Sequence, residues 1–229
     1  MLYSLMCGRA LFRPDRPPPN FATSRDAWRR PIPLPVVRHD VLDGQRSLDL
    51  MRWGLVPFWA KDIKVGFSNI NAKAEGIDSR PAFREAFRQR RCLVPVDNFY
   101  EWKKTATGKQ PYAIGLKGGG LMALAGLWDT WRSPGGERIR SFTIITTPPN
   151  ELCAQLHNRM PVVLAPAAWP VWLGEEPAEL AKVKAMLVPY PSDEMIAWPV
   201  SQRVGNVRNN DPGLVEPLSQ RLEPPGNVG

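Results

Sequence analysis

A methionine–cysteine pair near the start of the chain, Met6-Cys7, carries the most specific chemistry in the sequence. If the mature chain begins at Cys7, that residue has a free α-amine beside its own thiol. The amine of such a 1,2-aminothiol condenses with an aldehyde, and the thiol then closes a five-membered ring on the resulting imine. With residues 1–6 still attached, the amine is an amide and this chemistry is blocked.

Two further residues, Glu101 and His157, are of types that could move protons during such a condensation. Glu101 lies in an otherwise apolar run, residues 99–102, and the pattern leaves open whether its carboxylate faces solvent or a pocket. His157 follows a short predicted helix, where a histidine is commonly structural, although an ordinary pKa of about 6.5 also suits acid–base catalysis. The other histidine, His39, lies in a proline-rich segment and is interpreted as structural.

The composition is that of a globular protein with a basic surface. Of 229 residues, 43% are hydrophobic and 23% are charged, and no apolar run reaches the length of a membrane span. The three cysteines, Cys7, Cys92 and Cys153, form neither a disulfide framework nor a metal-binding spacing. We therefore expect a cytoplasmic protein without a metal or an organic cofactor. The net charge of +8 favours a polyanionic partner such as nucleic acid, which is a weak argument by itself.

Short apolar runs separated by turn residues indicate a mostly antiparallel β-sheet or barrel. Before about residue 45, repeated prolines argue against long helices and central strands. Turn signals follow at residues 107–108, 118–120 and 134–136. Strands are predicted over residues 48–53, 91–95, 99–103, 112–117, 121–128 and 139–147.

Short helices flank these strands. No linker or internal repeat divides the chain, so the sequence predicts a single α+β domain over residues 7–220 and a disordered tail over residues 221–229. The arginines at positions 84, 88 and 91 form either a phosphate-binding stripe or a solvated helix face. Helices are predicted over residues 79–87 with Ser79 as the N-cap, from Asn150 to about His157, and over residues 167–173 and 178–187.

A set of short motifs follows the chain from residue 6 to about residue 210. They are Met6-Cys7-Gly8-Arg9, WGLVPFW at residues 53–59, NAKAE at 71–75, RCLVP at 91–95, FYEW at 99–102, KQPY at 109–112, AGLW at 125–128, FTIITT at 142–147, HNRMP at 157–161 and VGNV at 204–207. Each motif is weak alone. The ordered set, which spans nearly the whole chain, resembles the SOS-response-associated peptidase (SRAP) family.

Members of that family crosslink covalently to abasic sites in single-stranded DNA, and the resemblance implies the same activity here. The implied linkage is a thiazolidine between the Cys7 aminothiol and the aldehyde of the ring-opened deoxyribose. By the same resemblance, Glu101 lies in a pocket as a general acid–base, and His157 exchanges a proton with the sugar oxygen. Asn71, otherwise a plausible turn residue, becomes a neutral hydrogen-bonding group of the site. Glu75 is interpreted as a carboxylate that pins neighbouring basic side chains.

The expected DNA contacts are cations and exposed rings, which suit a single strand. Lys73 stands where many members have arginine. A phosphate contact there would keep the positive charge but lose the two-pronged hydrogen bonding of a guanidinium. Aromatic residues in strands are usually core residues, which leaves a structural role open for Trp59 and Trp102. The DNA-binding residues predicted in this way are Arg9, Trp59, Lys73, Trp102 and Arg159.

Two features depart from the family pattern. An early family motif (an aromatic, Asn, an aliphatic, Ala, Pro) is absent, and residues 28–35 read WRRPIPLP instead, which leaves the preferred DNA structure open. The chain also has residues 1–6 before Cys7. We favour Met6 as the true start; alternatively, the Cys7 thiol attacks the preceding carbonyl and releases a leader, with Glu101 and His157 moving the protons. A retained leader would make the protein inactive as a crosslinker.

Three functions agree with these residues. The one we predict is covalent capture of abasic sites by a monomer that is nucleoid-associated when bound to DNA. The second is a cysteine peptidase acting on other proteins, which would need only Cys7 and His157. The third is a non-catalytic single-stranded DNA binder in which Cys7 is a small buried hydrophobe.

Overall fold

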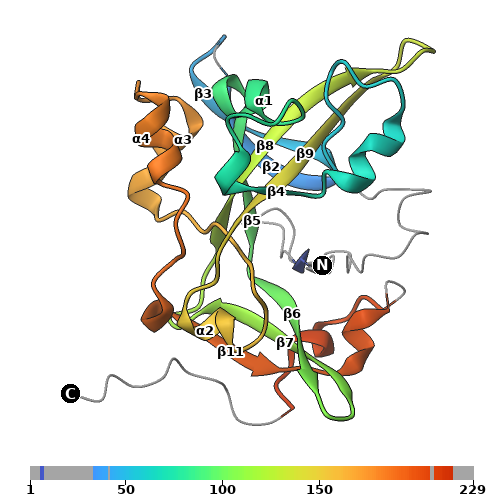
Figure 1. Ribbon diagram of the computed structural model, residues 1–229, viewed down its shortest axis with the longest axis vertical. Helices are drawn as coiled ribbons and strands as arrows, with labels where there is room; N and C mark the ends of the chain where they lie inside the picture. The colour runs from blue at the N-terminus through green and yellow to red at the C-terminus, as the bar shows by residue number, and fades with distance from the viewer. Residues whose placement is uncertain (1–5, 8–32, 41, 207–208, 219–229) are drawn as a thin grey trace.

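Five strands close into a β-barrel in the computed structural model, which describes residues 6–7, 33–40, 42–206 and 209–218 (Figure 1). Each strand pairs with its two neighbours, and every pairing is antiparallel except the parallel contact between β3 and β9. In order around the barrel the strands are β9 (Arg138–Thr147), β3 (Gln45–Trp53), β2 (Leu34–Asp40), β5 (Arg91–Val96) and β8 (Met122–Arg132). Two short strands also pair with β9: β4 (Asn71–Lys73) in parallel and β10 (Met160–Pro161) in antiparallel orientation.

A second, four-stranded antiparallel sheet lies below the barrel in Figure 1. The chain leaves β5 and enters this sheet after a single residue, Asp97, so the two sheets are directly connected. Its strands, in order, are β1 (Met6–Cys7), β6 (Asn98–Thr105), β7 (Gly108–Leu116) and β11 (Met195–Pro199).

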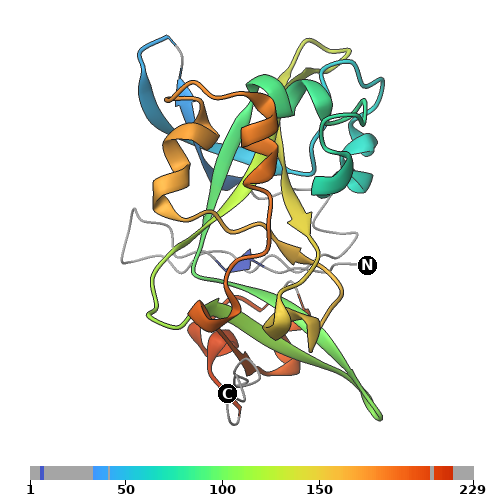
Figure 2. The same ribbon diagram turned by 60° about the vertical axis from the view of Figure 1, so that its left-hand side comes forward.

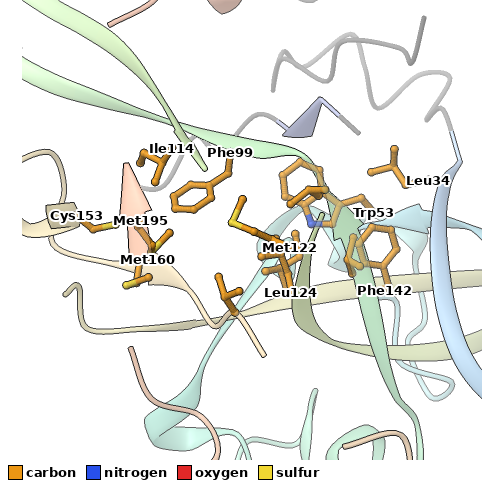
Figure 3. Packing of buried hydrophobic residues seen from close by; sticks show 14 of the residues in the cluster. Leu34, Trp53, Phe99, Ile114, Met122, Leu124, Phe142, Cys153, Met160 and Met195 are labelled. Atoms are coloured by element: carbon orange, nitrogen blue, oxygen red, sulfur yellow. The ribbon is translucent and has the colours of Figure 1, made fainter. Parts of the chain in front are cut away.

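One apolar core joins the barrel to the second sheet. Trp53 and Phe142 lie at the barrel end of this core, Met122 lies in its middle, and Phe99 and Met195 lie at the end formed by the second sheet (Figure 3). Because the same cluster is buried by both sheets, neither sheet has a complete core without the other. The predicted single α+β domain with a mostly antiparallel barrel is therefore confirmed.

The short helices α1 (Arg84–Gln89), α3 (Trp169–Leu173) and α4 (Leu180–Ala185) cover the outside of the barrel, as Figure 2 shows from a second direction. Their apolar side chains, for example Phe87 and Trp172, form a second core cluster with the outward-facing residues of the barrel. The α-helices are α1 (Arg84–Gln89), α2 (Glu151–Ala154), α3 (Trp169–Leu173) and α4 (Leu180–Ala185). The 3-10 helices are η1 (Ile63–Ser68), η2 (Ala74–Gly76), η3 (Pro166–Ala168), η4 (Ser192–Glu194), η5 (Gln202–Gly205) and η6 (Pro212–Val215).

All six predicted strands are present, but the expectation that no central strand occurs before about residue 45 is wrong for residues 34–40; residues 1–5, 8–32 and 41 lie outside the described residues. Strand β2 is part of the barrel and contains Pro35, which lies opposite Leu50 of β3. The β2–β5 ladder consists of the single pair Val37–Leu93. Pro35 therefore lies where β2 has a strand partner on one side only, so its missing N–H need not cost a ladder hydrogen bond.

The helix predicted from Ser79 begins later than expected. The α-helix starts at Arg84 with Phe83 as its N-cap, and residues 79–83 form turns. The Ser79 hydroxyl donates a hydrogen bond to the Gly76 carbonyl at 3.3 Å instead of capping a helix. The other predicted helices, including α2 with Asn150 as its cap, are confirmed.

Candidate active site

The backbone of Cys7 lies beside β6, at the edge of the second sheet. In the β1–β6 ladder Met6 pairs with Phe99 and Cys7 pairs with Asn98. Glu101 is three residues farther along β6, which corresponds to about 10 Å of extended strand. Figure 1 shows β1 between the barrel and the rest of the second sheet. The side chain of Cys7, like the expected DNA contact Arg9 and the expected tail at 221–229, is outside the described residues.

Glu101 is buried, which decides the question that its sequence pattern left open. Only 2% of the residue is exposed, and its Oε1 atom accepts no hydrogen bond from the described part of the chain. Burial disfavours the charged carboxylate and raises the pKa of Glu101 to about 8, although a hydrogen bond from the Trp102 backbone N–H acts in the opposite direction. Near neutral pH this carboxyl group is mostly protonated and can both donate and accept a proton.

Helix α2 brings Cys153 and His157 to the same region. The Cys153 thiol is buried, and burial together with the nearby negative charge of Glu101 raises its pKa to about 12. The His157 backbone N–H donates to the Cys153 carbonyl at 2.9 Å, so His157 follows α2 directly. Glu101, Cys153 and His157 are thus gathered from two elements that are far apart in the sequence.

His157 is half-buried and is held in one tautomer. The Arg159 backbone N–H donates to Nδ1 of His157 at 3.2 Å, so in the neutral ring the proton is on Nε2. Burial lowers the pKa of His157, and the positive charge of Lys109 lowers it further. The neutral imidazole, with its proton on Nε2, is therefore the prevailing form near pH 7.

Asn71 and Lys73 lie on β4, next to the end of β9. Asn71 pairs with Ile144 and Lys73 with Thr146, and the Lys73 side chain is exposed. Thr146, which our sequence analysis did not select, is buried, and its hydroxyl lies 3.5 Å from the Ala72 carbonyl. In the sequence Thr146 is one of two threonines that end the run at residues 139–147, and nothing in that pattern distinguishes it from Thr147.

The guanidinium of Arg159 already forms hydrogen bonds within the protein. Its guanidinium binds both carboxylate oxygens of Glu75 and donates to the Thr146 carbonyl at 2.6 Å. The interpretation of Glu75 as the residue that pins a basic side chain is confirmed. A phosphate contact by Arg159 would have to share these donors with Glu75.

The predicted aromatic contacts differ in exposure. Trp59 is 50% exposed and its neighbour Phe58 is 58% exposed. Their loop is fixed to β8, because the Phe58 N–H donates to Asp129 at 3.1 Å and the Trp131 indole donates to the Ala60 carbonyl at 2.6 Å. Trp102 is half-buried and packs against a core cluster that includes Tyr100, so it also has a structural role.

The arginines at 84, 88 and 91 do not form a phosphate-binding stripe. Arg88 pairs with Glu85 on α1. Arg91 belongs to β5, and its guanidinium donates to the backbone carbonyls of Trp172, Phe87 and Arg88. Within the described ranges, no group of three His, Cys, Asp or Glu side chains could hold a metal ion, and no helix is long and apolar enough to cross a membrane.

Comparison with known proteins agrees with this arrangement. The family model of the SOS response associated peptidase (SRAP) matches residues 6–207. The abasic site processing protein YoqW of Bacillus subtilis is 43% identical over 176 residues, which cover 76% of this chain and 79% of the relative. The abasic site processing protein HMCES of Gallus gallus is 33% identical over 80% of this chain and 61% of its own length.

Solved structures share the fold. A crystal structure of a protein from Bacteroides thetaiotaomicron superimposes with a TM-score of 0.72 at 27% identity, covering 81% of each chain. A protein from Bordetella bronchiseptica superimposes with a TM-score of 0.66 at 27% identity, covering 74% of this chain and 84% of the other. With the family model matching most of its length, the chain belongs to the SOS response associated peptidase (SRAP) family.

Proposed function

We propose that this protein captures abasic sites in single-stranded DNA covalently, through the α-amine and thiol of Cys7 after the preceding residues have been removed. The observation that carries the proposal is the buried Glu101, whose carboxyl group is protonated near neutral pH and lies on the strand that pairs with Cys7. The names of the relatives, abasic site processing proteins, give the substrate class.

The chemistry needs one aldehyde and loses one water. The Cys7 amine attacks C1′ of the ring-opened deoxyribose, and a proton moves from nitrogen to the carbonyl oxygen. Glu101 donates a proton to the resulting hydroxyl group, which leaves as water, and its carboxylate then takes the remaining proton from the nitrogen, which gives the neutral imine and restores the acid. The thiol then adds to the imine carbon, and its proton passes to nitrogen to form the thiazolidine.

The remaining residues assist these steps. The amine and thiol of a free N-terminal cysteine have ordinary pKa values of about 8 and 8.5, so both are partly reactive near neutral pH. The neutral His157 imidazole donates a hydrogen bond from Nε2–H to the sugar oxygen during ring opening, and Asn71 hydrogen-bonds the Cys7 backbone or the sugar. Lys73, Arg9, Trp59, Trp102 and Arg159 are the proposed DNA contacts.

The state of the N-terminus decides whether the protein is active. Either Met6 is the initiator and is removed, or the Met6–Cys7 peptide bond is cleaved by the protein itself. In both cases Cys7 gains a free amine, and a chain that retains Met6 cannot form the imine. We propose an active monomer that needs no metal or organic cofactor.

Intact mass spectrometry tests this proposal directly. Purified protein is measured alone and after incubation with a single-stranded oligonucleotide that contains one abasic site. We expect a mass that begins at Cys7 and a heat-stable adduct equal to protein plus oligonucleotide less one water. A chain that begins at Cys7 and forms no adduct would refute the proposal.

Variants separate the alternatives. If Met6 is the initiator and is removed, Cys7→Ser keeps the amine, so we expect an imine that borohydride traps and no stable thiazolidine, with DNA affinity retained; if the thiol performs the cleavage, the variant keeps its leader and forms neither. Glu101→Gln and His157→Ala should slow the crosslink by roughly 10²- to 10⁴-fold if each supplies general acid–base catalysis. An unchanged rate removes that residue from the mechanism. Cleavage of an unrelated protein without DNA would favour the peptidase alternative.

A further inference from the structure

Asn150 connects the start of α2 to three other parts of the molecule, and the proposed mechanism does not use it. Asn150 is buried, with only 6% of the residue exposed. The side-chain Oδ1 accepts from the Cys153 N–H at 2.9 Å, and Nδ2 donates to the Tyr190 carbonyl at 2.7 Å. Nδ2 also contacts Sδ of Met195 at 3.4 Å, and the Asn150 N–H donates to Sδ of Met160 at 3.3 Å.

These contacts matter because α2 cannot hold its own position. The helix has four residues, Glu151–Ala154, far fewer than an isolated helix needs to be stable in water. Its place must therefore come from tertiary contacts. Asn150 caps the helix and ties the cap to β10 through Met160 and to β11 through Met195.

Helix α2 in turn forms one wall around Glu101. Figure 3 shows Cys153, Met160 and Met195 gathered next to Phe99 and Ile114. Phe99 is two residues before Glu101 on β6, and Ile114 on β7 is the strand partner of Phe99. A sulfur-rich apolar layer on this side of the sheet keeps water away from the carboxyl group.

The titratable groups around Glu101 come from the strands and from α2. Tyr112 lies opposite it on β7, and Lys103 is two residues farther along β6. Cys153 faces it from α2 and stays neutral because its pKa is raised to about 12. His157, which follows α2 directly, belongs to the same region. Burial is the dominant cause of the raised pKa of Glu101, so admitting water should lower that pKa.

We infer that Asn150 is a positioning residue: by fixing α2 against β10 and β11, it keeps Cys153 near Glu101 and holds His157 in place directly after the helix. The inference rests on the proposed function for its catalytic consequence. Its structural consequence, the exclusion of water from Glu101, can be measured without any DNA.

The experiment is an infrared titration of the Glu101 carboxyl group. Difference spectra against Glu101→Gln isolate its signal in the wild type and in the Asn150→Ala background. We expect a wild-type midpoint of about 8 and, in Asn150→Ala, a midpoint moved toward acid by a tenfold or larger change in proton concentration. The pH profile of crosslinking should move in the same direction. An unchanged midpoint in a folded Asn150→Ala protein would overturn the inference.

Two controls exclude general loosening and misfolding. Val183→Ala, in α4 and buried in the other core cluster, should lower the melting temperature without moving the midpoint. An equal change of midpoint in Val183→Ala would overturn the inference. If Asn150→Ala does not fold, Asn150→Ser keeps a capping oxygen and lacks the amide donor, and its midpoint should move less far in the same direction. An unchanged midpoint in Asn150→Ser would again overturn it.

The proposed function and this inference can fail separately. A wild-type protein that begins at Cys7 and forms no adduct refutes the function, and the infrared midpoint still decides the role of Asn150. An adduct with an unchanged titration midpoint refutes the inference alone.

Discussion

Burial of Glu101 should make the stability of the folded protein depend on pH. In the unfolded chain this carboxyl group titrates near 4.5, and in the folded protein its pKa is about 8. Between these values the folded state binds more protons than the unfolded state, so the free energy of unfolding falls as the pH rises. The contribution is fully present below pH 4.5 and is lost as the pH passes through about 8.

We therefore predict that Glu101→Gln flattens this part of the stability profile. The amide keeps the shape of the acid and does not ionise, so the variant gains stability relative to the wild type above about pH 8. The gain is roughly 1.4 kcal/mol for every tenfold difference in proton affinity between the folded and unfolded states of the wild type. Denaturant unfolding at acid, neutral and alkaline pH measures this difference. Parallel profiles for the two proteins would show that folding does not strongly raise the pKa of Glu101.

The pairing of Glu75 with Arg159 leads to a second prediction at this scale. Glu75→Gln removes the carboxylate that occupies the guanidinium, which frees a cation beside β4. Binding to intact single-stranded DNA should then become more salt-dependent, with the logarithmic slope steeper by up to about 0.7, the value for one added phosphate contact. Glu85→Gln, which breaks the exposed pair with Arg88, is the matched control. Equal slopes for both variants would place Arg159 outside the DNA interface.

At the scale of the elements, β8 packs closely against both of its neighbours in the barrel. Gly126 pairs with Cys92 of β5 on one side and with Ile144 of β9 on the other. A Cβ atom at Gly126 would lie 2.9 Å from Sγ of Cys92 and 3.0 Å from the Thr143 carbonyl. Both neighbours belong to the closed barrel, so neither can move away freely.

Gly126→Ala should therefore destabilise the barrel by about 1–3 kcal/mol, the usual cost of overpacking. Gly118→Ala is the control, because a Cβ at Gly118 meets nothing within 4 Å. Chemical denaturation of the two variants gives the comparison. If both lose the same stability, close packing at Gly126 is not the cause.

Strands with a clear apolar pattern could be predicted from the sequence, and strands defined by long-range pairing could not. The run from Arg91 and the run from Ile139 each contain enough β-branched and apolar residues to indicate a strand. Strand β2 was missed because Pro35 argues against it, and that proline is acceptable because β2 pairs at Pro35 with β3 alone, its ladder with β5 being limited to Val37–Leu93. β4 and β10 have three and two residues, too few for any periodic signal.

The same distinction applies to the site. Glu101 and His157 could be selected because each is a polar residue within a recognisable motif. The electrostatic interaction between Glu101 and Cys153 could not be predicted, because it depends on where α2 packs against β11 of the second sheet. The link from Asn150 to Met160 and Met195 likewise exists only in the folded chain.

At the scale of the whole molecule, the net charge is +8, and the basic side chains differ in whether they are paired with carboxylates. Many arginines are paired with carboxylates, as in Arg46–Glu175 and Arg203–Asp211. By contrast, among the described residues no ion pair includes Lys103, Lys104 or Lys109 of the β6–β7 hairpin, and Lys104 lies directly opposite Lys109. Like charges opposite each other destabilise a hairpin, so an anion bound there would relieve the repulsion.

This distribution predicts two steps with different responses to salt. Initial binding to a single strand should weaken steeply, by roughly fiftyfold between about 50 and 200 mM salt if about four phosphates are neutralised. The double variant Lys104→Gln/Lys109→Gln should reduce the logarithmic slope by about 1.4, at 0.7 per phosphate. Arg84→Gln/Arg88→Gln removes the same formal charge from a helix where Glu85 already compensates it, and should change the slope little. The completed thiazolidine is a covalent bond and should persist in high salt, so adduct already formed must survive a salt wash that releases the undamaged strand. Loss of both species in the same wash would mean that the association is electrostatic throughout and that no covalent step follows it.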